Sequence, residues 1–134
     1  MWNILKIAGI ALVIFLLIDM VWLGLIAKNL YKNMLGSFMT PNVNWVAAII
    51  FYVIFTVGLA FFVINPAIQG AGLMHALLAG ALFGFVCYAT YDLTNLATLN
   101  NWPVLITVID LAWGSFVSAA TAALSYLVWM NWII

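Results

Sequence analysis

Apolar residues form four long blocks along the chain, and short polar segments separate them. The blocks cover residues 4–27, 45–64, 72–96 and 103–130. A helix needs about 20 mainly apolar residues to cross the hydrocarbon core of a bilayer, and each block reaches that length. The pattern therefore predicts an all-α polytopic membrane protein, with residues 1–134 forming a single transmembrane domain folded as an up-down four-helix transmembrane bundle.

Proline and tryptophan positions agree with these helix ends. The prolines fall in gaps or at the first residue of a block, where a missing N–H costs no hydrogen bond: Pro41, Pro66 and Pro103. Most tryptophans lie at predicted ends, where indoles favour the headgroup region: Trp2, Trp45, Trp102, Trp129 and Trp132. The first block is too long for the apolar region of a signal peptide and contains Asp19, so we expect a retained helix.

Composition excludes several classes of protein. Apolar residues make up 69% of the chain and charged residues 4%, whereas a soluble domain carries about 25% charged residues. The only cations are three lysines, which excludes a basic nucleic-acid binder. A single cysteine, Cys87, can form neither an intrachain disulfide nor a cysteine metal site. We therefore expect the lipid bilayer as the surroundings, and no cofactor, metal or nucleic acid as a partner.

Lysine positions give only a weak indication of orientation. Lys6 and the α-amino group mark one membrane face, and Lys28 and Lys32 mark the other. We favour the orientation that puts the first and third gaps in the cytoplasm.

All three acidic residues, Asp19, Asp92 and Asp110, fall within predicted spans. A charged side chain at a helix centre costs about 2.5 to 3.5 kcal/mol on insertion scales, so three of them need a compensating environment. Up-down threading brings the end of the first span, the end of the third and the start of the fourth to one membrane face. At the α-helical rise, the three carboxylates would then lie roughly 6 to 12 Å below that face.

The third and fourth spans each carry a polar and small-residue stripe. In the fourth span the stripe occupies an arc of roughly 80°: Thr107, Asp110, Gly114, Ser118, Thr121 and Ser125. In the third it occupies roughly 120°: Gly80, Gly84, Tyr88, Tyr91, Asp92 and Asn95. Glycines spaced by four let a neighbouring backbone approach closely. We expect these two spans to pack tightly, with both of their acids turned toward the bundle.

The first and fourth spans share a short Asp-x-x-Trp motif, called the echo motif below, in which Trp22 follows Asp19 and Trp113 follows Asp110 at the same spacing. This spacing puts each tryptophan one turn from its aspartate on one helical face. An indole N–H only donates, so it could hold an ionised carboxylate of the partner helix. The echo motif fits either an internal inverted repeat of the chain or a chance similarity between the two spans.

The acids have no cation within helical reach. Lys28 lies nine residues beyond Asp19, about 13 Å along a helix axis. The carboxyl groups are therefore protonated, hydrogen-bonded to neutral donors, or paired with a ligand. We favour a binding site over simple helix-to-helix hydrogen bonding because three clustered acids exceed what helix packing requires. The candidate binding residues are Asp19, Trp22, Tyr88, Tyr91, Asp92, Asn95, Thr107, Asp110 and Trp113.

Other chemistry-bearing residues give weaker signals. His75 lies near the opposite end of the third span, where an ordinary interface histidine is favoured over a proton relay. The aromatic residues of the second span predict lipid-facing packing: Phe51, Tyr52, Phe55, Phe61 and Phe62. Transition metals would require histidine or cysteine ligands that the spacing does not offer. No nucleophile with a neighbouring base occurs, so no catalytic residue is assigned.

Several motifs together resemble a known family. They are Asp19-x-x-Trp22-Leu23, Phe83-Gly84 with Tyr91-Asp92-Leu93-Thr94-Asn95, Asn101-Trp102-Pro103, and Asp110-x-x-Trp113-Gly114. They are similar to a family of small bacterial predicted membrane proteins catalogued as domain of unknown function 2177. The resemblance covers nearly the whole chain and implies a multi-pass, four-helix protein of the bacterial inner (cytoplasmic) membrane. It supports Asp19, Asp92, Asn95 and Asp110 as the motif core, implies no established activity, and associates members with neighbouring genes for lipid modification or photodamage response.

Two functions follow as hypotheses. The first is a binding or transport module, expected to be a homo-oligomer, whose carboxylates take up a proton, a cation or a small lipid-like amphiphile from the face with the first and third gaps. The alternative is a non-catalytic partner of lipid-modifying enzymes, in which the aspartates only bond helices together. An intramembrane enzyme with an aspartate as general base is a third possibility, but it lacks a second catalytic group.

Overall fold

The computed structural model describes residues 2–39 and 42–133, and these residues form helices and loops without a strand. The helical elements are α1 (Trp2–Val21), η1 (Trp22–Ile26), α2 (Lys28–Leu35), α3 (Trp45–Leu59), η2 (Ala60–Ile64), η3 (Ala67–Ala71), α4 (Gly72–Thr98), α5 (Val104–Val128) and η4 (Trp129–Ile133). Elements marked η are single π-helical turns that continue or connect the α-helices. The predicted all-α fold class is confirmed.

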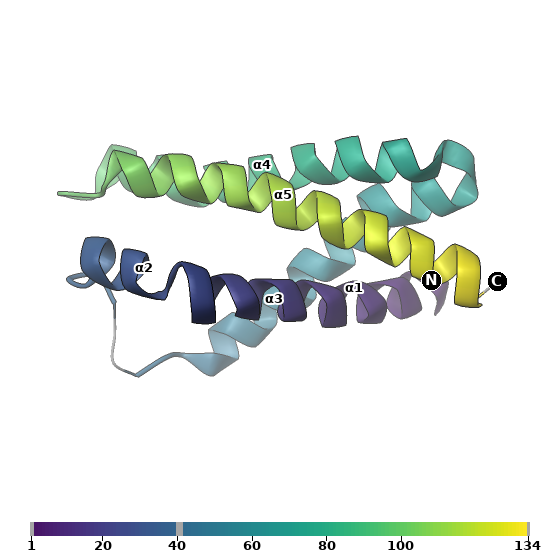
Figure 1. Cartoon of the computed structure of the whole chain (residues 1–134), viewed down its shortest axis with the longest axis horizontal. Helices are drawn as coiled ribbons and strands as arrows, with labels where there is room; N and C mark the ends of the chain where they lie inside the picture. Colours follow the sequence, from purple (N-terminus) through teal and green to yellow (C-terminus); the bar gives the residue numbers. More distant parts are fainter. Residues whose placement is uncertain (1, 40–41, 134) are drawn as a thin grey trace.

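Three continuous helical stretches within the described residues are long and apolar enough to cross a membrane: Trp2–Ile26, Trp45–Thr98 and Val104–Ile133. The middle stretch has 54 residues and reverses direction near its midpoint. Gly70 and Gly72 have φ of 134° and 87° there, a conformation that glycine adopts without the steric cost of a Cβ. Consequently α3 and α4 run in opposite directions (Figure 1), and the long helices among the described residues are α1, α3, α4 and α5.

The closest helix packing joins α4 to α5, which lie side by side in Figure 1. A Cβ on Gly80 would lie 3.0 Å from Cβ of Ala122, and one on Gly84 would overlap the Gly114 carbonyl oxygen and Ser118. Only glycine permits this approach, because any side chain would separate the two backbones. The tight packing predicted for the third and fourth spans is confirmed.

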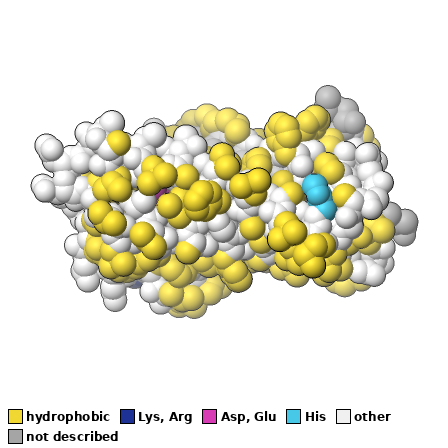
Figure 2. Space-filling view, turned by 90° about the horizontal axis from the view of Figure 1, so that it is seen from above, with side chains coloured by type: hydrophobic (Ala, Val, Ile, Leu, Met, Phe, Trp, Pro, Cys, Tyr) yellow, Lys and Arg dark blue, Asp and Glu magenta, His cyan; other side chains and the backbone are white. Residues whose placement is uncertain are grey.

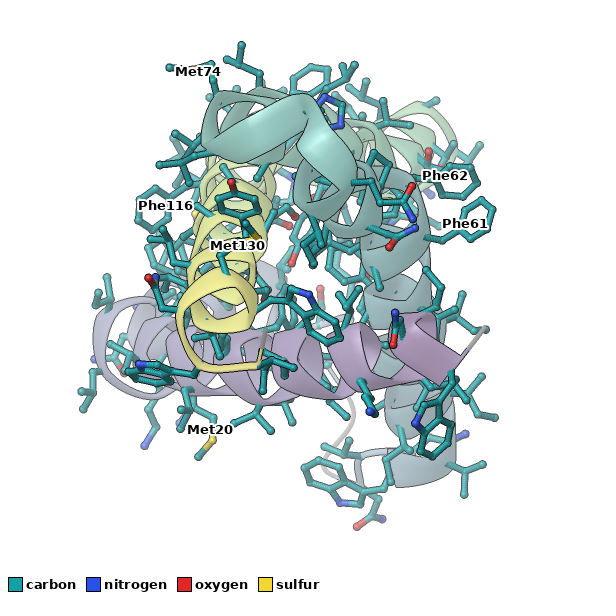
Figure 3. All side chains as sticks on the ribbon, turned by 90° about the vertical axis from the view of Figure 1, so that its right-hand side faces the viewer. Met20, Phe61, Phe62, Met74, Phe116 and Met130 are labelled. Atoms are coloured by element: carbon teal, nitrogen blue, oxygen red, sulfur yellow. The ribbon has the colours of Figure 1, made fainter. Side chains whose placement is uncertain are left out.

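Large apolar side chains cover the outer surface. In the end-on view of Figure 3, Met20, Phe61, Phe62, Met74 and Phe116 point outward on different sides of the bundle, and each is more than half exposed. Figure 2 shows hydrophobic side chains spread over much of one face, with only a trace of acidic atoms between them. A surface of this kind is stable in hydrocarbon, where apolar side chains need no partner.

The structure corrects the prediction for two regions near helix ends. The long polar gap after the first span contains helix α2, which begins after a break at Ala27 with φ −102° and ψ 1°. Trp2, Trp45 and Trp132 are exposed as expected for interfacial indoles, but Trp102 and Trp129 are only 6% and 7% exposed. Trp102 packs against the rings of Phe38 and Tyr91, and Trp129 belongs to the buried apolar core.

Candidate functional site

A cavity of about 690 Å³ lies at the end of the bundle that carries α2. Seven of the nine predicted site residues line it: Asp19, Trp22, Tyr88, Tyr91, Asp92, Asp110 and Trp113. They come from the C-terminal parts of α1 and α4, the π-turn η1, and the N-terminal half of α5. Antiparallel threading therefore brings the three acids to one end of the bundle.

Asn95 and Thr107, both within the described residues, do not line this cavity. Thr107 lies in the first turn of α5, where its Oγ1 accepts from Trp102 Nε1 at 3.2 Å and donates to the Pro103 carbonyl at 3.3 Å. Asn95 lies one turn beyond Tyr91 and interacts with that phenol. Both share a helical stripe with an acid, but the stripes extend further than the cavity does.

Asp19 is held by neutral donors from two other helices and is 8% exposed. Its Oδ1 accepts from Trp113 Nε1 at 3.3 Å, and its Oδ2 accepts from the Tyr52 hydroxyl at 3.5 Å. The predicted hold of an indole N–H on a carboxylate of the partner helix is confirmed for this pair. Both donors point at the carboxyl oxygens, so they offset part of the cost of burying a charge there.

Asp110 accepts a hydrogen bond from the Tyr31 hydroxyl, which reaches into the cavity from α2. The Tyr31 oxygen in turn accepts from Trp22 Nε1 at 3.2 Å. Burial, and then the hydrogen bond to Asp110, raise the pKa of Tyr31 above its ordinary value, so the phenol stays a neutral donor. Trp22 thus acts on the aspartate of the partner helix through Tyr31, whereas the sequence predicted a direct bond.

The two indoles of the echo motif contact each other. Trp22 stacks on Trp113 with ring centroids 4.4 Å apart and an interplanar angle of 11°. Each tryptophan therefore connects its own helix to the carboxyl group of the other, directly for Trp113 and through Tyr31 for Trp22. The stacked pair forms an aromatic wall between Asp19 and Asp110.

Asp92 is fully buried, and neither of its carboxyl oxygens has a hydrogen-bond partner among the described residues. Its carboxyl group lies within interaction distance of the Asp110 carboxyl. Two ionised carboxylates at such a distance repel each other, whereas a proton on one of them makes a hydrogen bond to the other. A proton or a cation held between the two carboxyl groups would relieve this repulsion.

Sequence reasoning missed three further residues of this end. Lys28 and Tyr31 line the cavity, although they lie in the polar segment predicted as a gap between spans. Tyr52 was expected to face lipid, and this was wrong because its hydroxyl donates to Asp19. The sequence signal that could have identified these tyrosines was a phenol predicted at the same end of the bundle as the three acids.

One other aromatic residue of α3 also departs from the lipid-facing expectation. Phe55 is 3% exposed in contact with Phe15 and Phe83, whereas Phe51 lines the cavity and is also 47% exposed. Phe61 and Phe62 are exposed, as predicted. The second span therefore uses one face for packing and the other for lipid.

The acids do not form a compact metal cage. Within residues 2–39 and 42–133, no three His, Cys, Asp or Glu side chains lie close enough together to hold a metal ion. Three carboxyl groups and one ammonium group nevertheless line one cavity, together with six aromatic side chains. This donor set suits a larger ligand with a delocalised positive charge more closely than a bare ion.

These features define a polytopic helical membrane protein with an acidic, aromatic-walled cavity at one end of its bundle. The chain belongs to the family described as predicted membrane protein (DUF2177), whose model matches residues 4–127. Comparisons with curated proteins and with solved structures found no match.

Proposed function

We propose that the protein binds a positively charged amphiphile, taken up from the membrane into the acidic cavity. The observation that carries this function is the Asp92 carboxyl, fully buried without a partner beside Asp110 in a cavity large enough for a small organic molecule. A cation placed there would supply the missing partner and allow both carboxyl groups to ionise.

The lining chemistry supports an organic cation. The faces of aromatic rings attract cations, and indoles do so most strongly. Trp22, Trp113 and Tyr88 surround the acids with such faces. Intramembrane acids are costly unless they serve a ligand or each other, and here one of the three lacks a donor.

The cavity rim supports entry from the lipid. Leu23, Met39 and Phe51 line the cavity and are themselves 45%, 54% and 47% exposed. Their exposed apolar surfaces would border acyl chains, so an amphiphile could enter sideways with its charged group leading. The volume lies within the range of roughly 300 to 1,000 Å³ that is usual for small-molecule sites.

Binding of tetraphenylphosphonium to the protein in nanodiscs tests this function. We expect saturable binding of this bulky cation, and none of tetraphenylborate, which has the same shape and the opposite charge. Asp110→Asn should weaken binding at least about tenfold, since it removes a negative charge worth about 1.4 kcal/mol or more of affinity.

A matched tryptophan pair controls for indirect effects. Trp113→Phe removes a cavity wall and should weaken binding, whereas Trp132→Phe changes an exposed indole at the opposite end and should not. Equal affinity for both ions, or equal affinity of the Asp110→Asn variant and the unchanged protein, would contradict the proposed function.

The alternative function is a non-catalytic partner of lipid-modifying enzymes, and one observation favours it. Asp19 and Asp110 already accept hydrogen bonds from other helices, as purely structural acids would. In that case the Asn variants should lose thermal stability in proportion to the bonds they weaken, and cation binding should be absent from the start. Co-purification of a defined lipid-modifying enzyme would then support the partner role.

The proposed setting follows the family resemblance. We place the single-domain protein in the bacterial inner membrane, with the cavity end facing the cytoplasm, and we expect a homo-oligomer. Crosslinking in native membranes tests the oligomer.

A further inference from the structure

Three hydroxyl groups on α5 are buried without a hydrogen-bond partner among the described residues. Ser118, Thr121 and Ser125 are at most 1% exposed, and each of their oxygens is unpartnered. A helical Ser or Thr normally donates to a carbonyl of its own preceding turn. Thr56, equally buried on α3, does so to the Tyr52 carbonyl at 2.7 Å. The α5 hydroxyls therefore keep unused hydrogen-bonding capacity, and an unmade buried hydrogen bond costs about 1 to 3 kcal/mol.

These hydroxyls occupy the stretch of α5 between two cavities. The acidic cavity includes Asp110, and a second cavity of about 590 Å³ at the opposite end of the bundle is lined by Lys6 and by Trp129. Ser118 lies about two turns after Asp110, and Ser125 lies about one turn before Trp129. The distance from Asp110 to Ser125 along the helix is about 22 Å, which is most of a hydrocarbon core about 30 Å thick.

The turn between Asp110 and Ser118 is occupied by a phenol. Gly114 has no side chain there, and a Cβ on it would lie 2.8 Å from Cδ2 of Tyr88. Tyr88 also lines the acidic cavity, so its ring extends from the carboxyl groups to the level of Gly114. Polar groups therefore recur at nearly every turn of α5 between the two cavities.

A histidine on α4 lies at the far end of this series. Gly80 packs against Ser118 and Ala122, so the antiparallel α4 puts His75 at about the level of Ser125. Its Nε2 is buried and has no partner among the described residues, and Figure 2 shows the histidine ring at the surface toward the end that carries the termini. Lys6 lines the second cavity itself, and His75 lies outside that lining.

We propose that Ser118, Thr121 and Ser125 form a hydrated proton path that connects the Asp92–Asp110 pair to the second cavity. The proton shared by the two carboxyl groups passes to water held by the hydroxyls, and an equal proton enters the pair from the acidic cavity. Each hydroxyl accepts one hydrogen bond and donates another, so it relays a proton without net change. The same carboxyl pair serves the proposed ligand site, but the path requires no amphiphile.

Proton flux into liposomes that contain the protein tests the path. A potassium gradient with valinomycin supplies the driving voltage, and an enclosed pH dye reports acidification. We expect the unchanged protein to acidify the interior faster than empty liposomes do. A variant with Ser118→Ala, Thr121→Val and Ser125→Ala together should fall to the rate of empty liposomes, as should Asp92→Asn.

A second triple variant serves as the matched control. Thr90→Val, Thr94→Val and Thr98→Val remove three hydroxyls from α4 that are exposed and already donate to their own helix. This variant should retain the full proton flux. If the α5 triple variant does not fold, Thr121→Val alone replaces it, because that change nearly preserves side-chain volume.

The outcomes separate this path from the ligand site. The α5 variant should bind tetraphenylphosphonium normally and melt at an unchanged or higher temperature, since it loses only unpartnered polar groups. Flux of the unchanged protein no faster than empty liposomes, or full flux in the α5 variant, would overturn the path. Full flux with no cation binding would overturn the ligand site and leave the path supported.

Discussion

Tyr31 connects α2 to the carboxylate site, and its phenol is the group that a point substitution tests most directly. Tyr31→Phe removes both the donor to Asp110 and the acceptor for Trp22 while keeping the ring. We expect amide hydrogen exchange across Lys28–Leu35 to become about fivefold faster, since a net hydrogen bond is worth about 1 kcal/mol. Tyr126→Phe, on α5 near the opposite end, is the matched control and should leave that exchange unchanged.

The pH dependence of this contact follows from the raised pKa of Tyr31. A phenol whose folded-state pKa exceeds its unfolded value of about 10 stabilises the fold fully below that pH and loses the contribution as pH rises through the folded pKa. Protection of α2 against exchange, corrected for intrinsic rates, should therefore be constant from neutral pH to about pH 9 and decline only above about pH 10. A decline below pH 9 that is absent from Tyr31→Phe would show that the phenol ionises in the folded state.

The α4–α5 pair is the element that sets the distance between Asp92 and Asp110, and Gly84 determines how closely the two helices approach. Gly84→Ala would force a Cβ into the Gly114 carbonyl oxygen and Ser118. We expect a loss of about 1 to 3 kcal/mol, the usual cost of overpacking, seen as a lower midpoint of thermal unfolding in nanodiscs. Gly9→Ala on α1 meets no atom within 4 Å and should be neutral or slightly stabilising.

Element-scale features were predictable where one physical cause dominates the sequence signal. Long apolar blocks predict spanning helices because lipid tolerates nothing else, and glycines spaced by four predict the α4–α5 contact. The acids were identifiable because a charge within a span is costly. The position of Tyr31 was not predictable, since it depends on the π-turn η1 and the break at Ala27, and the apolar pattern does not reveal the direction in which these send α2. Thr107 lies outside the cavity lining, since a shared helical face fixes the direction of a side chain but not its distance from the cavity.

At the scale of the whole molecule, the reversal at Gly70 and Gly72 decides how many times the chain crosses the bilayer. The stretch Trp45–Thr98 is one continuous run of 54 helical residues, but α3 and α4 within it run in opposite directions. They are joined at the end of the bundle near both termini (Figure 1). Each half is long enough to cross once, since about 20 residues suffice. The structure therefore predicts four crossings, with both termini on one side of the membrane and α2 on the other.

Single cysteines introduced into a Cys87→Ser background test this topology. Ser37 follows α2 and Asn100 follows α4, whereas Gln69 precedes the reversal at the opposite end. In sealed inside-out and right-side-out vesicles, a membrane-impermeant maleimide should label Ser37→Cys and Asn100→Cys from one side, and Gln69→Cys from the other. On the orientation that we favour, the first two are cytoplasmic. Labelling of Ser37→Cys and Asn100→Cys from opposite sides would mean that Trp45–Thr98 crosses an odd number of times, and the three acids could not then share one membrane face.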